Sequence, residues 1–311
     1  MKRQFLAAAL GWALWTPAAA QRQDPIPPCT CESVEGVEAA REGMKAHSRR
    51  SLQEASAAYS EALRLAPSRD ANPAEQALAL RLAPVVLASS REPFPLKDAA
   101  AILHPNGEWI AYHLFWEDDI DFPDDNDPCD HEVVWVRVDR ARGAASEIYT
   151  YFHGRILKAP GTGGVRPRVV AQWGKHGTMP WDWRNLLIDA DEGDVEWRYL
   201  GSEKANSAGK LTLEAYNLAT YKKLSTYGRE SQESLLARGW PFRFDGSWED
   251  FIRFNRPWDL APILKKNGLV RVSHFNNASL NRQLIRYNFA AKTEWPDAMC
   301  HTPVRAAAAP R

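Results

Sequence analysis

The chain has no formal net charge and few long apolar runs. Its 311 residues include 39 Lys and Arg against 39 Asp and Glu, so its formal net charge is zero. Proteins that bind nucleic acid usually carry a basic surface, and this balance argues against a nucleic-acid partner. Beyond residue 20 no stretch is long and apolar enough to cross a bilayer, so we expect no transmembrane segment.

Common catalytic signatures are also missing. The chain has no Gly-x-Ser-x-Gly motif, no His-Glu-x-x-His motif and no glycine loop for phosphate. Its acidic loop at 117–127 lacks the glycine-centred spacing of an EF-hand. The chain therefore carries none of the usual hydrolase or nucleotide-binding signatures. An enzyme that lacks these motifs stays an open alternative.

The first residues predict export. Residues 1–20 combine a basic start, a short alanine-rich apolar run and an Ala-x-Ala ending, which is the pattern of a secretory signal peptide. The run is too short for a good membrane anchor. We expect a mature chain that starts near Gln21 and is periplasmic or secreted.

Cysteine is scarce, and the four cysteines are Cys29, Cys31, Cys129 and Cys300. An even count in an oxidising compartment favours disulfides over metal binding. Cys29 and Cys31 are too close to bridge easily to each other. We expect Cys129 and Cys300 to pair with each other or with these two, and the connectivity stays open.

After a Pro-rich linker at 21–32, residues 33–80 predict a helical hairpin that resembles one tetratricopeptide repeat. Positions that match the offsets of the repeat are Gly43, Ala55, Tyr59, Ala62 and Pro67. Small Gly43 and Ala55 let two helices approach, Tyr59 fills the gap, and Pro67 ends the second helix. One repeat cannot form a solenoid. The hairpin either docks on the main domain or binds a peptide or protein partner.

Residues 83–300 predict a mainly β domain with α additions. Residues 109–116 are apolar on both faces, which is typical of a central, buried strand. Further strands are expected at 132–139, 168–173 and 195–200. Helical spacing follows at 211–227, 231–239 and 247–255, with Ser247 as a helix cap. We expect an antiparallel β-sandwich with helical insertions in the last third and a flexible tail at 301–311.

Six segments carry a family resemblance. In order they are Ala83–Val86, Glu92–Pro95, Ile110–Trp116, Asp130–Arg137, His153-Gly154 and Val170–His176. They resemble the vacuolar protein sorting sixty-two family, within a broader group of sandwiches that includes the necrosis-inducing toxins. The resemblance covers residues 83–179, about a third of the chain. It implies a sandwich and, from the toxin relatives, a divalent cation that engages sphingolipid head groups.

The chain departs from that family at the acidic motif. His131 replaces the Trp between the two acids, and Cys129 replaces the preceding Gly. The His that usually precedes this block is missing, and acidic Asp127 lies nearby. Toxin activity therefore does not carry over to this chain.

The acidic motif itself predicts a metal site. Asp130 and Glu132 lie at i and i+2 in a strand, so they share a face, while His131 points away. His153 and His176 follow neighbouring strands and are the other expected ligands. Carboxylates with one or two imidazoles suit Ca²⁺, Mg²⁺ or Mn²⁺. A solvated strand end with ordinary surface histidines is the alternative.

Ligand contacts are expected beside this site. They would come from rings that stack on a sugar and from acids of the loop: Trp173, Trp181, Trp183, Asp119 and Asp121. The alternatives are burial of the rings in a core and a solvated acidic loop.

Three functions follow. The first is an exported protein whose divalent cation assists binding of a glycan, a lipid head group or a small polar ligand. The second is a metal-dependent hydrolase in which Asp130 and His176 act as acid and base on a metal-bound water. The third is an interaction protein that uses the helical hairpin. A deep cleft with an open metal position would favour the enzyme, and a shallow aromatic groove would favour the binder.

Overall fold

A computed structural model describes residues 36–49, 51–120, 130–163, 166–189, 209–227, 247–276 and Trp295. The predicted signal peptide, the linker and the tail lie outside the described residues, as do all four cysteines and Asp121. The predicted strand at 195–200 and the predicted helix at 231–239 also lie outside them.

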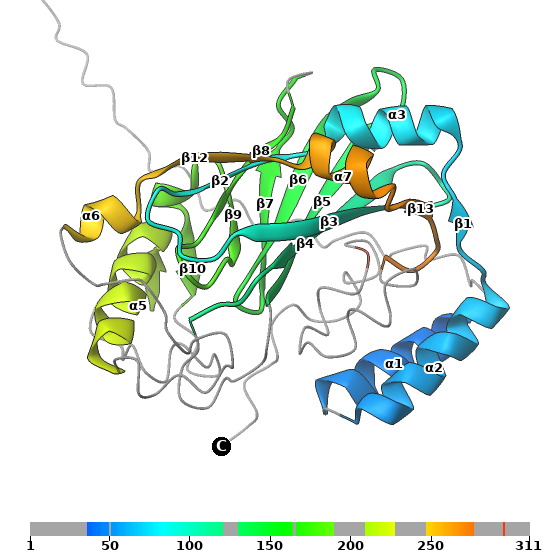
Figure 1. Cartoon of the computed structure of the whole chain (residues 1–311), viewed down its shortest axis with the longest axis horizontal. Coiled ribbons are helices and arrows are strands. Elements are labelled where there is room, and N and C mark those ends of the chain that lie inside the picture. The colour runs from blue at the N-terminus through cyan, green and yellow to red at the C-terminus, as the bar shows by residue number, and fades with distance from the viewer. Residues whose placement is uncertain are drawn as a thin grey trace, which may run out of the picture.

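The elements are arranged as Figure 1 shows. The helices are α1 (Val37–Ser48), α2 (Leu52–Leu65), α3 (Pro73–Leu82), α5 (Leu213–Tyr227), α6 (Trp248–Phe251) and α7 (Leu260–Asn267), with the 3-10 turn η1 (Trp183–Asn185). The first strands are β1 (Arg69–Asp70), β2 (Val85–Ser89), β3 (Leu96–Leu103), β4 (Trp109–Trp116), β5 (Asp130–Asp139), β6 (Ala144–Phe152) and β7 (Arg155–Pro160). The later strands are β8 (Arg168–Ala171), β9 (Thr178–Pro180), β10 (Leu187–Asp189), β11 (Lys210–Thr212), β12 (Phe254–Asp259) and β13 (Val270–Val272).

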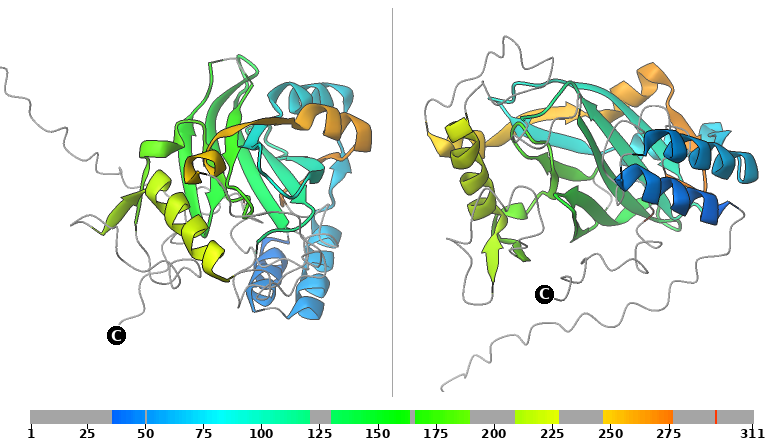
Figure 2. Two further views of the ribbon diagram at one scale, coloured as in Figure 1. Left: turned by 60° about the vertical axis from the view of Figure 1, so that its left-hand side comes forward. Right: turned by 90° about the horizontal axis from the view of Figure 1, so that it is seen from below.

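The predicted helical hairpin is formed by α1 and α2. A Cβ on Gly43 would lie 2.5 Å from the Tyr59 ring, so only glycine permits this approach of the helices. The Tyr59 hydroxyl also contacts His47 Nδ1 at 3.2 Å. The role of Gly43 and Tyr59 that the sequence predicts is thereby confirmed. Figure 2 shows the hairpin and α5 well apart, toward opposite ends of the molecule.

Helix α3 belongs to the main core and not to the hairpin. Asn72 and Glu75 form a capping box at its start, with Pro73 in the first turn. Its buried Ala79 and Leu82 pack with the sheet residues of the first core cluster. The predicted unit at 33–80 therefore contains a hairpin followed by a helix that lies on the sheet.

Among the described residues there are two large sheets and one small one. Seven strands form the order β1-β13-β3-β4-β5-β6-β7, four form β12-β2-β8-β9, and β10 pairs with β11. Most pairs are antiparallel, but β13 pairs with β3 and β2 pairs with β8 in parallel. The antiparallel pairing that the sequence predicts is therefore wrong at these two pairs. In each pair a long connection lets the two strands run in the same direction, as parallel pairing requires.

Strand β4 lies in the middle of the seven-stranded sheet, as the two-faced apolar pattern predicts. Tyr112 and Leu114 face a core that also contains Val86 and Val169 of the four-stranded sheet. Trp109 and Ala111 face a second cluster on the opposite side. The first core therefore contains residues of both large sheets.

The last third contains the predicted helices in part. Ser247 caps α6 by accepting a hydrogen bond from the Glu249 N–H. The helix ends at Phe251, and residues from Phe254 form an edge strand beside β2, which the helical spacing at 247–255 did not predict. Within the described ranges, no helix combines the length and apolar character that a bilayer crossing requires.

Candidate functional site

The site is built around the turn at 172–177, which joins β8 to β9. Every residue from Ala171 to Pro180 is buried, although this is a turn. Gly174 has φ 66° and His176 has φ 54°. A non-glycine residue with positive φ is strained, and such strain persists only where surrounding contacts impose it.

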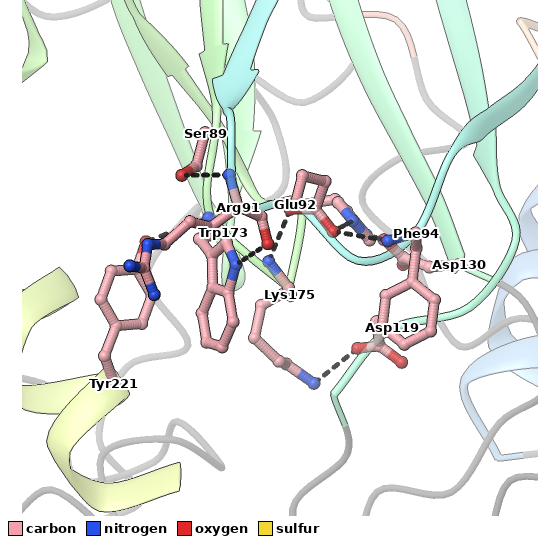
Figure 3. Close-up of polar contacts among 11 residues, drawn as sticks. Ser89, Arg91, Glu92, Phe94, Asp119, Asp130, Trp173, Lys175 and Tyr221 are labelled. Carbon is pink, nitrogen blue, oxygen red and sulfur yellow. Dashed lines mark hydrogen bonds and ion pairs between the residues drawn. The ribbon is translucent and has the colours of Figure 1, made fainter. Parts of the chain in front are cut away.

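Two carboxylates hold the His176 ring. Its Nδ1 lies 2.9 Å from Asp130 Oδ2, and its Nε2 lies 3.0 Å from Glu92 Oε1. The ring stacks on Trp116 with centroids 4.1 Å apart and planes 5° from parallel. His176 and Glu92 side chains are fully buried. Figure 3 shows Glu92, Asp130 and their surroundings.

This environment fixes the charge of His176. Burial alone would lower the pKa of the ring, but the Glu92 and Asp130 carboxylates outweigh it and raise the pKa to about 10. Each ring nitrogen faces an acceptor, so both nitrogens donate and the ring is an imidazolium at neutral pH. Such a ring has no lone pair for a metal and cannot accept a proton.

Glu92 is the site residue that sequence reasoning missed. Its carboxylate accepts from the N–H groups of Gly174 at 2.8 Å and Phe94 at 3.1 Å, in addition to His176. It lies in the segment Glu92–Pro95, which contributes to the family resemblance, but its partner His176 is 84 residues away in sequence. Nothing local in the sequence indicates that pairing.

The adjacent residue of the turn makes a second buried ion pair. Lys175 Nζ lies 2.6 Å from Asp119 Oδ2, and the two side chains are 3% and 12% exposed. The backbone joins them, since the Ile120 N–H donates to the Gly174 carbonyl at 2.6 Å. Asp119, expected to contact a ligand, is thus paired with a cation of the turn.

The predicted metal ligands are only partly brought together. Asp130 and His176 are in direct contact, and Glu132 lies buried two residues along β5. His153 lies in the β6–β7 turn, with Nε2 2.5 Å from Gln172 Oε1. In the part of the chain that the structure describes, no three His, Cys, Asp or Glu side chains are placed to hold one ion. Asp130 and Glu92 lie at opposite nitrogens of His176, so the imidazole separates the two carboxylates. With both nitrogens occupied, His176 does not fit the predicted ligand role.

His131 lies on the other face of β5, as strand alternation predicts. Its Nε2 is 2.8 Å from His113 Nδ1, and His113 Nε2 donates to the Asn276 carbonyl at 2.9 Å. A carbonyl oxygen only accepts, so His113 carries its proton on Nε2.

Two of the three predicted stacking rings lie in a core. Trp173 packs against Tyr221 and Phe251, and its Nε1 donates to the Arg91 carbonyl at 2.8 Å. Trp183 packs against Phe254. Both rings are buried and offer no surface to a sugar, which corrects that expectation. Trp181 is 51% exposed, and the Arg168 guanidinium lies 4.0 Å from its ring centroid.

Comparison with family models, with curated proteins and with solved structures finds no match for the chain. Its function has to be inferred from the residues of the site.

Proposed function

We propose that the chain is an exported binding protein that recognises a polar ligand, either a glycan or a lipid head group, with the help of a divalent cation. One observation supports this proposal: four carboxyl groups, three of them buried, lie at the adjoining ends of two paired strands. Asp118 and Asp119 follow β4, Asp130 and Glu132 begin β5, and Trp116 pairs directly with Asp130.

The donor chemistry supports a hard cation. Carboxylate oxygens are the ligands that Ca²⁺, Mg²⁺ and Mn²⁺ prefer, and buried carboxylates favour a cation nearby. Asp118, Asp130 and Glu132 would hold the ion, and the ion would supply a positive charge that attracts a phosphate or hydroxyl oxygen. His176 does not fit a ligand role and His153 is hydrogen-bonded to a glutamine, so the cation site proposed here is built from oxygens alone. Binding would draw these carboxyl groups together.

A hydrolase is the weaker alternative. It needs His176 as a base, but an imidazolium held between two carboxylates has no site for a further proton.

We also propose that the two large sheets form a sandwich, since one core contains residues of both. That architecture is the one that the family resemblance implies.

Calorimetric titration with Ca²⁺, Mg²⁺ and Mn²⁺ tests the cation. The wild-type protein should bind at least one of them, and Asp130→Asn should bind about tenfold or more weakly because a charged oxygen donor is lost. Glu147→Gln is the control, since Glu147 pairs with Lys158 and Arg137 elsewhere on the sheet. No heat with the wild type, or equal affinities for wild type and Asp130→Asn, would refute the cation site.

The ligand class is tested by retention on a glycan array and on sphingolipid vesicles, with and without a chelator. Binding to one of them that the chelator abolishes supports the proposal. Binding to neither, or binding that the chelator leaves unchanged, contradicts it.

A further inference from the structure

The turn at 172–177 contacts both stems of the acidic connection between β4 and β5. These stems are residues 117–120, which follow β4, and Asp130, which begins β5. Lys175 pairs with Asp119 on the stem that leaves β4, at 2.6 Å. The next residue, His176, pairs with Asp130, the first residue of β5, at 2.9 Å. Two consecutive side chains of one turn therefore hold one acid on each stem. Figure 3 shows Asp119, Asp130 and Lys175 in this arrangement.

Backbone contacts reinforce the same connection. The Ile120 N–H donates to the Gly174 carbonyl at 2.6 Å, which joins the β4 stem to the turn independently of any charge. Within the turn, His176 N–H donates to the Gln172 carbonyl at 2.9 Å. The turn is thus closed on itself and attached to both stems.

The shape of the turn depends on a residue outside it. Gly174 and His176 both have positive φ, and Glu92 accepts a hydrogen bond from each of them, at 2.8 Å from Gly174 N and 3.0 Å from His176 Nε2. Glu92 is itself fixed, since Oε1 also accepts from Phe94 N at 3.1 Å. Hydrogen bonds to a buried charged group are strong, so this carboxylate can impose the strained conformation.

We propose that residues 172–177 form a clamp on both stems of the acidic connection, and that Glu92 is the positioning residue that keeps the clamp in shape. Glu92 touches no proposed cation ligand and acts through Gly174 and His176. An effect of Glu92 on cation affinity rests on the proposed function, because the clamp sets the position of Asp130, a proposed ligand, and of Asp119 beside it. The clamp itself is independent of any ligand.

Hydrogen exchange followed by mass spectrometry, without added cation or ligand, tests the clamp in the full chain. In Glu92→Gln, exchange should rise about tenfold or more in peptides that cover residues 114–120, 130–135 and 172–177. Peptides from the α1–α2 hairpin, which packs in core clusters separate from that of the turn, should be unchanged. Glu147→Gln is the reciprocal control, which should affect β6 and β7 and leave both stems protected.

A uniform rise in exchange across all strands of Glu92→Gln, or unchanged stems, would overturn the clamp. Should Glu92→Gln fail to fold, Asp119→Asn decides the matter, since it weakens the ion pair with Lys175 and leaves the His176 contacts in place. Exchange should then rise at 114–120 and not at 130–135, and equal changes at both would refute the proposal.

Cation titration of Glu92→Gln separates this inference from the proposed function. If the wild-type protein binds a cation, Glu92→Gln should bind it about tenfold more weakly with its Asp130 intact. If the wild-type protein binds none, the proposed function fails and the exchange pattern still decides the clamp.

Discussion

At the scale of single residues, His176 explains most of the site. Its ring is a cation because two carboxylates from distant parts of the chain meet it, 46 and 84 residues away in sequence. A histidine next to acids reads equally well as a metal ligand or a base when only the sequence is seen. The pairing at both nitrogens excludes those roles, and it makes His176 a structural cation that joins Glu92 to Asp130.

This assignment predicts how stability depends on pH. The pKa of His176 is raised from 6.5 to about 10 on folding. The stabilisation is therefore complete below the unfolded pKa and is lost as pH rises from about 6.5 towards 10. Between about pH 7 and 9.5, the free energy of unfolding of the wild-type protein should fall more steeply than that of His176→Gln. Urea unfolding at several pH values measures both slopes, and equal slopes would contradict the imidazolium.

The same ring should matter for stability at neutral pH. Removing one partner of a buried ion pair leaves an uncompensated charge, so His176→Gln should lower the free energy of unfolding by roughly 3–5 kcal/mol. Urea unfolding near neutral pH measures this loss, with Glu54→Gln on the exposed face of α2 as the control. A loss within about 0.5 kcal/mol would show that the pairs contribute little.

At the scale of elements, two glycines are needed for different reasons: Gly154 has a left-handed backbone, and Gly43 lies at a close approach of two helices. His153 and Gly154 form the two-residue turn between β6 and β7, with Phe152 paired to Arg155. Both have positive φ, at 44° and 77°, which is the geometry of a type I′ hairpin turn. The His-Gly pair that contributes to the family resemblance is thus explained locally by turn chemistry.

Gly154→Ala isolates backbone strain. A Cβ at Gly154 would meet nothing within 4 Å, so the only cost is the left-handed conformation. We expect a loss of about 1–2 kcal/mol in the free energy of unfolding, with unchanged cation binding. Urea unfolding beside titration checks both, and a neutral substitution would mean that the turn relaxes.

Gly43→Ala isolates crowding in the helical hairpin. Alanine favours a helix by about 1 kcal/mol over glycine, but the new Cβ would lie 2.5 Å from the Tyr59 ring. We expect a net loss of about 1–3 kcal/mol. The double variant Gly43→Ala/Tyr59→Leu should recover part of it, and a double-mutant cycle from urea unfolding measures the coupling. Strict additivity would refute the contact.

At the scale of the whole molecule, the sequence predicts what depends on local pattern. Strand β4 is central because residues 109–116 are apolar on both faces, and Gly43 with Tyr59 predicts the helix pair. Ser247 correctly marks the start of α6. These predictions hold because side-chain periodicity, capping and small-residue packing are encoded within a few positions.

What the sequence does not predict depends on distant partners. The strand at 254–259 contains Pro257 and is exposed at most positions, so it forms only because β2 offers it an edge. The parallel pairing of β13 with β3 joins segments far apart in the sequence, and no local motif encodes it. Glu92 was not predicted as a site residue for the same reason, since its role depends on His176.

The central claim is that His176 is a fixed imidazolium while any cation is held by carboxylates. Ring ¹⁵N chemical shifts measure this most directly in protein labelled at histidine, with His176→Gln assigning the signal. Both nitrogens of His176 should be protonated from about pH 7 to 9, and saturating Ca²⁺ should leave them unchanged while backbone signals of Asp130 and Glu132 move. A bare ring nitrogen near neutral pH, or a ring shift that shows coordination of the added cation, would contradict the account.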